Sequence, residues 1–263
     1  MITDPPLPPL VHPAAEHLIE HLDQKIAQVL TTLESSEMWR TLTSDNTPSE
    51  VVQAILREVH LEIFSYNASI VEATIALIGQ MPRSLPVRRL KAMLYHQADE
   101  FDHGEMGLRD YVALGGDERE ARTRRISPAA FAAAGVWWMM VHQRDPFAYL
   151  GAEYLFESLT PLVCERAMPL LAARGIAGGT MEFIKFHAEE DPAHANLMRQ
   201  LIRDVVKQYP EAEASIRYGM DCFIQVYPIP VWQAALQRVI EPAKDGVLFA
   251  EPNAPRPGVP SPR

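Results

Sequence analysis

The chain has 263 residues, about the upper end of what one domain usually holds, so we expect one large domain. Hydrophobic residues make up 48% and charged residues 22%, an ordinary globular mix that argues against a disordered or fibrous chain. Lys plus Arg number 24 against 34 Asp plus Glu, giving a net charge of −10. A surface of that sign repels phosphate backbones and anionic lipid headgroups, which excludes nucleic acid and membranes as expected partners.

Cysteine use and the apolar stretches indicate the compartment. Only Cys164 and Cys222 occur, too few for a disulfide framework or a thiolate metal site. Residues 1–12 lack the basic segment and apolar core of a secretion signal, and the longest apolar stretch, 128–141, is short of the ~20 residues that span a bilayer. We therefore expect a soluble cytoplasmic protein.

Proline marks both ends of the folded region. Five of the 22 prolines lie within the first 13 residues and six more lie from Pro242 to Pro262. Such segments are typical of extended or disordered tails. The sequence therefore predicts an N-terminal tail over 1–13, one domain over 14–241 and a disordered C-terminal tail over 242–263.

Between the tails, apolar residues recur at helical spacing and no alternating strand pattern is convincing. A capping box at Thr47 to Glu50, the Ser127-Pro128 and Asp145-Pro146 pairs and the Gly115-Gly116 stop mark helix ends. The pattern predicts an all-α, single-domain bundle of seven or eight helices. These are a stripe from Leu18 to Leu33, a helix from Thr47 to about Met81, one from near Pro86 to Leu114, helices over 128–142 and 146–173, one from Gly178-Gly179 to about Gln208, and two over 211–241.

The most informative segment contains His187, Asp191 and His194. At about 100° per residue these three side chains fall within about 60° on one helix face. Two imidazoles and a carboxylate suit a divalent transition metal such as iron, because calcium sites offer oxygen alone and structural zinc sites favour thiolates. A solvated polar face is the alternative explanation for this segment taken alone.

A second segment strengthens the metal hypothesis. Glu100 and His103 are three residues apart and therefore adjacent on one helix surface, which is the spacing that holds di-iron centres in helical bundles. Leu94 and Tyr95 before this pair and Met106 and Leu108 after it are apolar, as expected if the pair faces the bundle interior. The Asp191 and His194 pair repeats the same spacing on another helix.

Two metals would need a further carboxylate from a third helix. Glu157 is the best candidate, because it lies among large apolar residues where an unpaired carboxylate is costly. Glu153 lies one turn earlier on the same face and competes with it. Glu62 could supply an outer ligand or support one.

These three segments together resemble the haem-oxygenase-like di-iron oxidases and oxygenases, a family that includes the fatty-acid decarboxylases that form terminal alkenes. The resemblance rests on Glu100-x-x-His103, on the stretch Tyr154 to Thr160, and on His187-x3-Asp191-x2-His194, in the family's order and at similar separations. It covers about residues 15 to 240 and implies a haem-oxygenase-like bundle. It also implies that the iron ligands are Glu100, His103, Glu157, His187, Asp191 and His194, with Glu157 as the bridge.

One position departs from an ordinary ligand helix. Pro192 removes a backbone amide between Asp191 and His194, so we expect the helix to be kinked or interrupted there. A labile second metal position would follow, with the order of the segment around 184–196 coupled to metal binding.

The resemblance implies a non-haem di-iron enzyme that uses two Fe(II) ions per chain and O2 on a small metabolite. The reaction would be oxidative C–C cleavage of a fatty or amino acid, or N-oxygenation of an amine, and both a homodimer and an external electron donor are compatible with it. The competing functions are a ferritin-like metal store and a non-enzymatic helical interaction protein. Thiamine-degrading relatives are disfavoured because neither cysteine has a polar setting, and haem oxygenase itself would leave the Glu/His/Asp cluster unexplained.

Overall fold

The computed structural model describes residues 12–176, 180–190 and 192–241. Over this part of the chain it contains eleven α-helices and no strand, which confirms the predicted all-α bundle. The tails predicted over 1–13 and 242–263 lie almost wholly outside the described residues. The helices are α1 (Pro13–Glu34), α2 (Glu37–Thr43), α3 (Ser49–Gln80), α4 (Val87–Ala113), α5 (Glu118–Thr123), α6 (Pro128–Gln143), α7 (Ala148–Ala172), α8 (Glu182–Glu190), α9 (Pro192–Gln208), α10 (Ala212–Ile224) and α11 (Ile229–Ile240).

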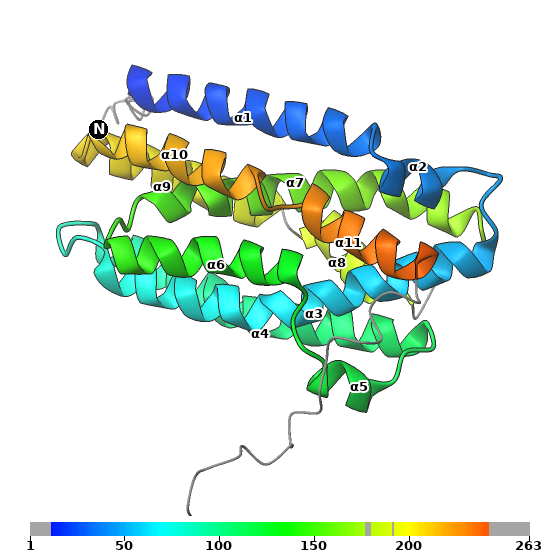
Figure 1. Cartoon of the computed structure of the whole chain (residues 1–263). Coiled ribbons are helices and arrows are strands. Elements are labelled where there is room, and N and C mark those ends of the chain that lie inside the picture. The colour runs from blue at the N-terminus through cyan, green and yellow to red at the C-terminus, as the bar shows by residue number, and fades with distance from the viewer. Residues whose placement is uncertain (1–11, 177–179, 191, 242–263) are drawn as a thin grey trace, which may run out of the picture.

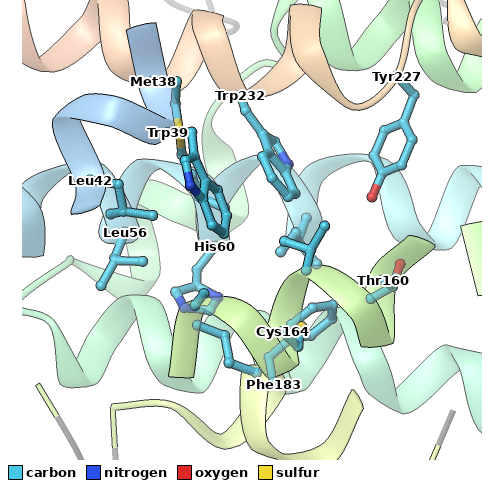
Figure 2. Close-up of a pocket in the computed structure, with 15 residues that line it drawn as sticks. Met38, Trp39, Leu42, Leu56, His60, Thr160, Cys164, Phe183, Tyr227 and Trp232 are labelled. Atoms are coloured by element: carbon cyan, nitrogen blue, oxygen red, sulfur yellow. The ribbon is translucent and has the colours of Figure 1, made fainter. Parts of the chain in front are cut away.

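The helices stack in layers around one hydrophobic core. Helices α3, α4 and α6 lie side by side, α7 packs against α9 and α10, and α1 covers α7 and α9 from outside (Figure 1). Buried apolar side chains from almost every helix join in a single core cluster. A cavity lined mainly by apolar side chains remains between α2, α3, α7, α8 and α11 (Figure 2).

Helix α7 runs through the middle of the bundle and meets α10 unusually closely. A Cβ on Gly151 would lie 1.9 Å from the Ile216 carbonyl oxygen, and one on Gly219 would lie 1.8 Å from the Ala148 carbonyl oxygen. Only glycine at both positions permits this approach, because no side chain fits between the two backbones. The contact fixes α7, and with it the carboxylates that α7 carries.

By length and composition, α3 is the one helix of the described chain that could cross a membrane. However, 61% of its most apolar window is buried inside the bundle. Long apolar core helices of soluble proteins pass the same test, so this is weak evidence for a membrane span.

Several helix boundaries differ from the sequence predictions. Helix α3 begins at Ser49 after Pro48 without a side-chain cap, so the capping box at Thr47 is not formed. The Ser127 cap of α6 and the positive φ of Gly115 after α4 are confirmed. The single helix expected from 180 to 208 is two helices, α8 and α9, and Pro192 is the first residue of α9, where a missing amide is tolerated. Gly178, Gly179 and Asp191 lie outside the described residues.

Candidate metal centre

Helix α4 brings three potential metal ligands to one buried face. His96, Glu100 and His103 follow each other at spacings of four and three residues, which places them on the same side of a helix. All three are buried, with exposed fractions of 4%, 7% and 2%. Burial of so many polar groups requires partners, because each would otherwise lose its hydration without compensation.

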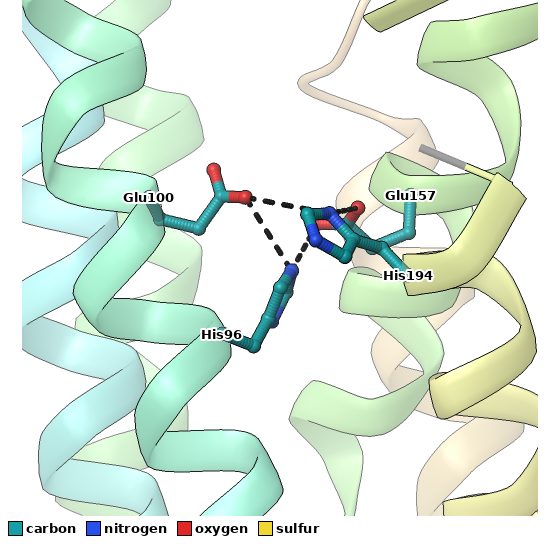
Figure 3. A group of neighbouring side chains, drawn as sticks. All are labelled: His96, Glu100, Glu157 and His194. Carbon is teal, nitrogen blue, oxygen red and sulfur yellow. Dashed lines mark ion pairs between the residues drawn. The ribbon is translucent and has the colours of Figure 1, made fainter. Parts of the chain in front are cut away.

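The first group of donors consists of His96, Glu100, Glu157 and His194 from α4, α7 and α9 (Figure 3). One ligand atom from each lies within 4.8 Å of the other three. His96 Nε2 is 3.4 Å from Glu100 Oε1 and 3.3 Å from Glu157 Oε1, and His194 Nδ1 is 3.4 Å from Glu157 Oε2. Ligands at about 2.1 Å from one ion and near a right angle to each other are separated by about 3 Å, so this spacing fits a metal.

The hydrogen bonding of His96 provides a test of that fit. Its Nε2 faces two carboxylates but forms no hydrogen bond with either, although it is fully buried. A buried ring nitrogen aimed between two carboxylates without a hydrogen bond is rare unless something else binds there. Two imidazole nitrogens and two carboxylate oxygens form a donor set suited to iron and similar transition metals.

The buried charges of the first group shift the pKa values of His96 and Glu100 in opposite directions. Burial acts to lower the pKa of His96, but Glu157, Glu100 and Glu153 outweigh it and raise that pKa to about 11. Burial acts to raise the pKa of Glu100, yet the hydrogen bond from His103 and the charges of His103 and His96 hold it well below its usual range. A proton on His96 thus compensates part of the buried negative charge, and a divalent cation at the same point would replace it.

The second group of donors lies on the other side of Glu100. His103 Nδ1 donates to Glu100 Oε2 at 2.8 Å, and the rings of His103 and His187 meet edge to face at 4.6 Å between centroids. His187 is buried, and its Nδ1 donates to the Phe183 carbonyl oxygen at 2.7 Å. This bond leaves the lone pair on His187 Nε2, which is the usual arrangement of a metal-binding histidine.

Of the six ligands predicted from the sequence, the structure gathers five. Glu100, His103, Glu157, His187 and His194 lie in the two adjoining groups, while Asp191 lies outside the described residues. Glu100 joins the groups, since its Oε1 faces His96 and its Oε2 accepts from His103.

Glu153, the competitor of Glu157, lies behind His96 and not among the donors of the first group. Its Oε1 accepts from the Gln97 side-chain amide at 2.7 Å and is 3.6 Å from His96 Nδ1. Burial raises the pKa of Glu153 to about 8, against the opposing charge of His96. Glu153 therefore acts on the imidazole ring through its charge and through Gln97, whose side-chain amide nitrogen also lies 3.2 Å from His96 Nδ1.

Glu62 has its hydrogen-bond partners outside both groups of donors. Its Oε2 accepts from Ser127 Oγ at 2.5 Å and its Oε1 pairs with Arg238. Burial still raises the pKa of Glu62, although Arg238 and Ser127 oppose this. Ser127 and Arg238 therefore engage both carboxylate oxygens, and these contacts give no support to the hypothesis that Glu62 is an outer ligand or a support for one.

The sequence predictions missed His96. The signal was its position four residues before Glu100, which puts a second histidine on the ligand face of α4. With His96 included, α4 supplies donors to both groups.

Comparisons with known proteins identify the family to which the chain belongs. The profile of a family described as iron-containing redox enzymes matches residues 64–227, which is more than half of the chain. That span contains every candidate ligand. Among curated proteins, none matches the sequence.

Two solved structures have the same fold. A domain of unknown function with a haem oxygenase-like fold from Shewanella denitrificans superposes with a TM-score of 0.69 at 19% identity, covering 88% of this chain and 98% of that one. A TenA homologue from Pseudomonas syringae pv. tomato superposes with a TM-score of 0.63 at 14% identity, covering 90% and 97%. The fold is haem oxygenase-like, and the chain belongs to the family of iron-containing redox enzymes.

Proposed function

We propose that this protein is a non-haem di-iron oxidase or oxygenase that acts on a small metabolite. The observation that carries the proposal is the pair of adjoining buried donor groups that share Glu100. Membership of an iron-containing redox family supports iron as the metal. The first group has two histidines and two carboxylates, and the second adds His103 and His187 beside the shared Glu100; this arrangement supports two metal positions rather than one.

The ligands in this proposal are Glu100, His103, Glu157, His187, Asp191 and His194, with His96 added to the first group. Glu157 was expected to bridge the metals, but its two oxygens face His96 and His194, which belong to one group. Glu100 has one oxygen toward each group and is therefore a second candidate for the bridge.

Two bound Fe(II) ions would supply the activation of O2, which protein side chains cannot perform alone. The chain contributes a dry site, since the ligands of α4 and α7 and His187 are nearly inaccessible to solvent. The side-chain amide of Gln97, which also donates to Glu153, contacts His96 Nδ1, and the carbonyl oxygen of Phe183 holds the ring of His187. The reaction classes we propose are oxidative C–C cleavage of a fatty or amino acid and N-oxygenation of an amine, with electrons from an external donor.

A ferritin-like metal store is the alternative function, because such proteins use the same Glu-x-x-His spacing. Two observations favour an enzyme. The fold is haem oxygenase-like rather than a regular four-helix bundle, and an apolar cavity adjoins the donor groups. We also propose a cytoplasmic location, with neither nucleic acid nor membrane as a partner.

The proposal is tested by loading the purified chain with ferrous iron under anaerobic conditions. We expect about two irons per chain, and at least one fewer in His103→Ala and in His187→Ala. Exposure to O2 should then produce an absorbing species whose decay rate depends on a particular small molecule. His142→Ala, an exposed histidine on α6, is the control and should keep both irons. Full stoichiometry in both ligand variants would refute the ligand assignment, and O2-driven iron accumulation without small-molecule dependence would indicate storage.

A second experiment distinguishes Glu157 from Glu153. Glu157→Ala should lose iron and turnover, because it removes two of the oxygens that face the first group. Glu153→Gln should keep its iron and lower affinity by about 10- to 100-fold, as loss of an outer partner does. If Glu153→Gln abolished binding while Glu157→Ala retained it, the register on α7 would be wrong by one turn.

A further inference from the structure

Besides the metal centre, the structure contains an apolar cavity whose role the proposed metal chemistry does not explain. It has a volume of about 60 Å³ and is lined by fifteen residues from α2, α3, α7, α8, α11 and the segment before α11 (Figure 2). Trp39 from α2 and Trp232 from α11 are among these residues and lie beside each other in the view of Figure 2. None of these lining residues is Lys, Arg, Asp or Glu.

The cavity shares walls with the metal centre. Phe183 lines the cavity, and its ring stacks on that of His187 with centroids 3.8 Å apart. Thr160 also lines it, and lies one helical turn after Glu157 on α7. The ring of Phe183 therefore separates a molecule held in the cavity from His187 of the second group.

His60 is the one ionisable imidazole in the lining, and its polarity is not satisfied. The side chain is 1% exposed, and neither Nδ1 nor Nε2 has a hydrogen-bond partner. The nearest carboxylate oxygen, Asp110 Oδ2, is 3.8 Å from Nε2, too far for a hydrogen bond. Burial, with the nearby His187, lowers the pKa of His60 to about 4, so the ring is neutral near pH 7. A buried neutral imidazole without a partner suggests that a ligand supplies one.

We propose that this cavity binds a short, uncharged aliphatic group of the substrate, with a neutral hydroxyl of that substrate hydrogen-bonded to His60. That the bound molecule is the substrate rests on the function proposed above, whereas the existence of the binding site does not depend on that function. A neutral imidazole has one donor and one acceptor nitrogen, and a hydroxyl can pair with either. A carboxylate would enter without any cation to compensate its lost hydration.

The cavity volume limits the size of this group. A cavity of about 150 Å³ holds a benzene molecule. A space of about 60 Å³ therefore holds a branched aliphatic group of roughly three to five heavy atoms rather than an aromatic ring.

The probe that matches these limits is 2-methyl-1-propanol, and its carboxylate counterpart is isobutyrate. Either is titrated into the full chain, without iron and with ferrous iron, and followed by tryptophan fluorescence. The His60 ring resonances are followed in the iron-free, histidine-labelled chain. We expect saturable changes with the alcohol in both forms and none with isobutyrate at the same concentrations.

Two variants make the result specific. His60→Leu should weaken alcohol binding about three- to tenfold, the effect of one lost hydrogen bond. It should also raise Tm by about 3–6 °C, because an unpartnered buried imidazole is replaced by an apolar side chain. Val163→Phe fills the cavity from α7 without altering His60 and should abolish alcohol binding.

Equal binding of isobutyrate, unchanged alcohol affinity in His60→Leu, or a lower Tm in that variant would overturn the proposal. The last outcome would show that His60 is a structural partner of Asp110. Since the titration is also made without iron, failure here leaves the di-iron assignment untouched. Conversely, a result that refuted the di-iron assignment would not affect the evidence for the alcohol-binding site.

Discussion

Glu100→Gln is expected to remove iron from both positions at once, with bound iron falling from about two equivalents to well below one. The carboxylate is buried, its Oε1 faces His96 and His194, and its Oε2 accepts from His103. A neutral amide of the same shape keeps the packing but removes the negative charge that both groups share. Iron analysis after anaerobic loading measures the effect, together with loss of any O2-dependent absorbance.

The control for this variant lies on the same helix. Glu105→Gln changes an exposed carboxylate of α4 that pairs with Arg122 at the surface, so it should keep both irons and nearly unchanged stability. Retention of one full equivalent in Glu100→Gln would show that Glu100 serves a single metal. In that case Glu157 would again be the better candidate for the bridge.

The long helices could be predicted from sequence because local signals mark them. The Ser127 cap and the left-handed Gly115 act within a few residues, and the structure uses both. The short helices α2 and α5 were missed, since six or seven residues are too few to establish an apolar period. At Pro192 a kink or an interruption was predicted, and the structure has an interruption, because which of the two occurs depends on packing.

The site also has parts that local sequence predicts and parts that it does not. The Glu100 and His103 pair was predicted from spacing, yet two of the apolar flanks used to argue its burial, Leu94 and Tyr95, are 46% and 70% exposed. The pair is buried by contacts of α4 with α3, α8 and α9 and by Glu157 of α7, which the local sequence does not reveal. For Glu62, the sequence suggested a role beside the metals and could not reveal its partner, because Arg238 lies 176 residues away in the chain. The cavity around His60 draws on five helices and had no local signal.

Asp110→Ala is expected to loosen α8 and to weaken the iron position that depends on His187. Asp110 is fully buried on α4, and its carboxylate accepts from the backbone amides of Glu182 and Phe183, both at 2.9 Å. These amides begin α8 and have no partner within the helix. The same helix that supplies His96, Glu100 and His103 therefore also anchors the helix that carries His187.

Removal of this anchor leaves the buried amide of Phe183 unsatisfied, at about 1–3 kcal/mol, and the part-buried amide of Glu182 at a lower cost. Denaturant unfolding should show a loss of about 2–4 kcal/mol, moderated where water reaches the amides. Amide exchange across α8 and the start of α9 should accelerate without iron and slow again when ferrous iron is added, because metal binds only the ordered arrangement. Iron content should fall from about two equivalents to about one.

Asp117→Ala is the matched comparison, because Asp117 caps α5 by accepting from the Glu120 amide at the surface. It should lose about 1 kcal/mol or less and keep both irons, since α5 carries no ligand. If Asp110→Ala unfolded the chain altogether, Asp110→Asn would retain one acceptor oxygen and allow the same exchange measurement. Unchanged exchange across α8 in a folded Asp110 variant would show that contacts of α8 with α7 position His187 without the anchor from α4.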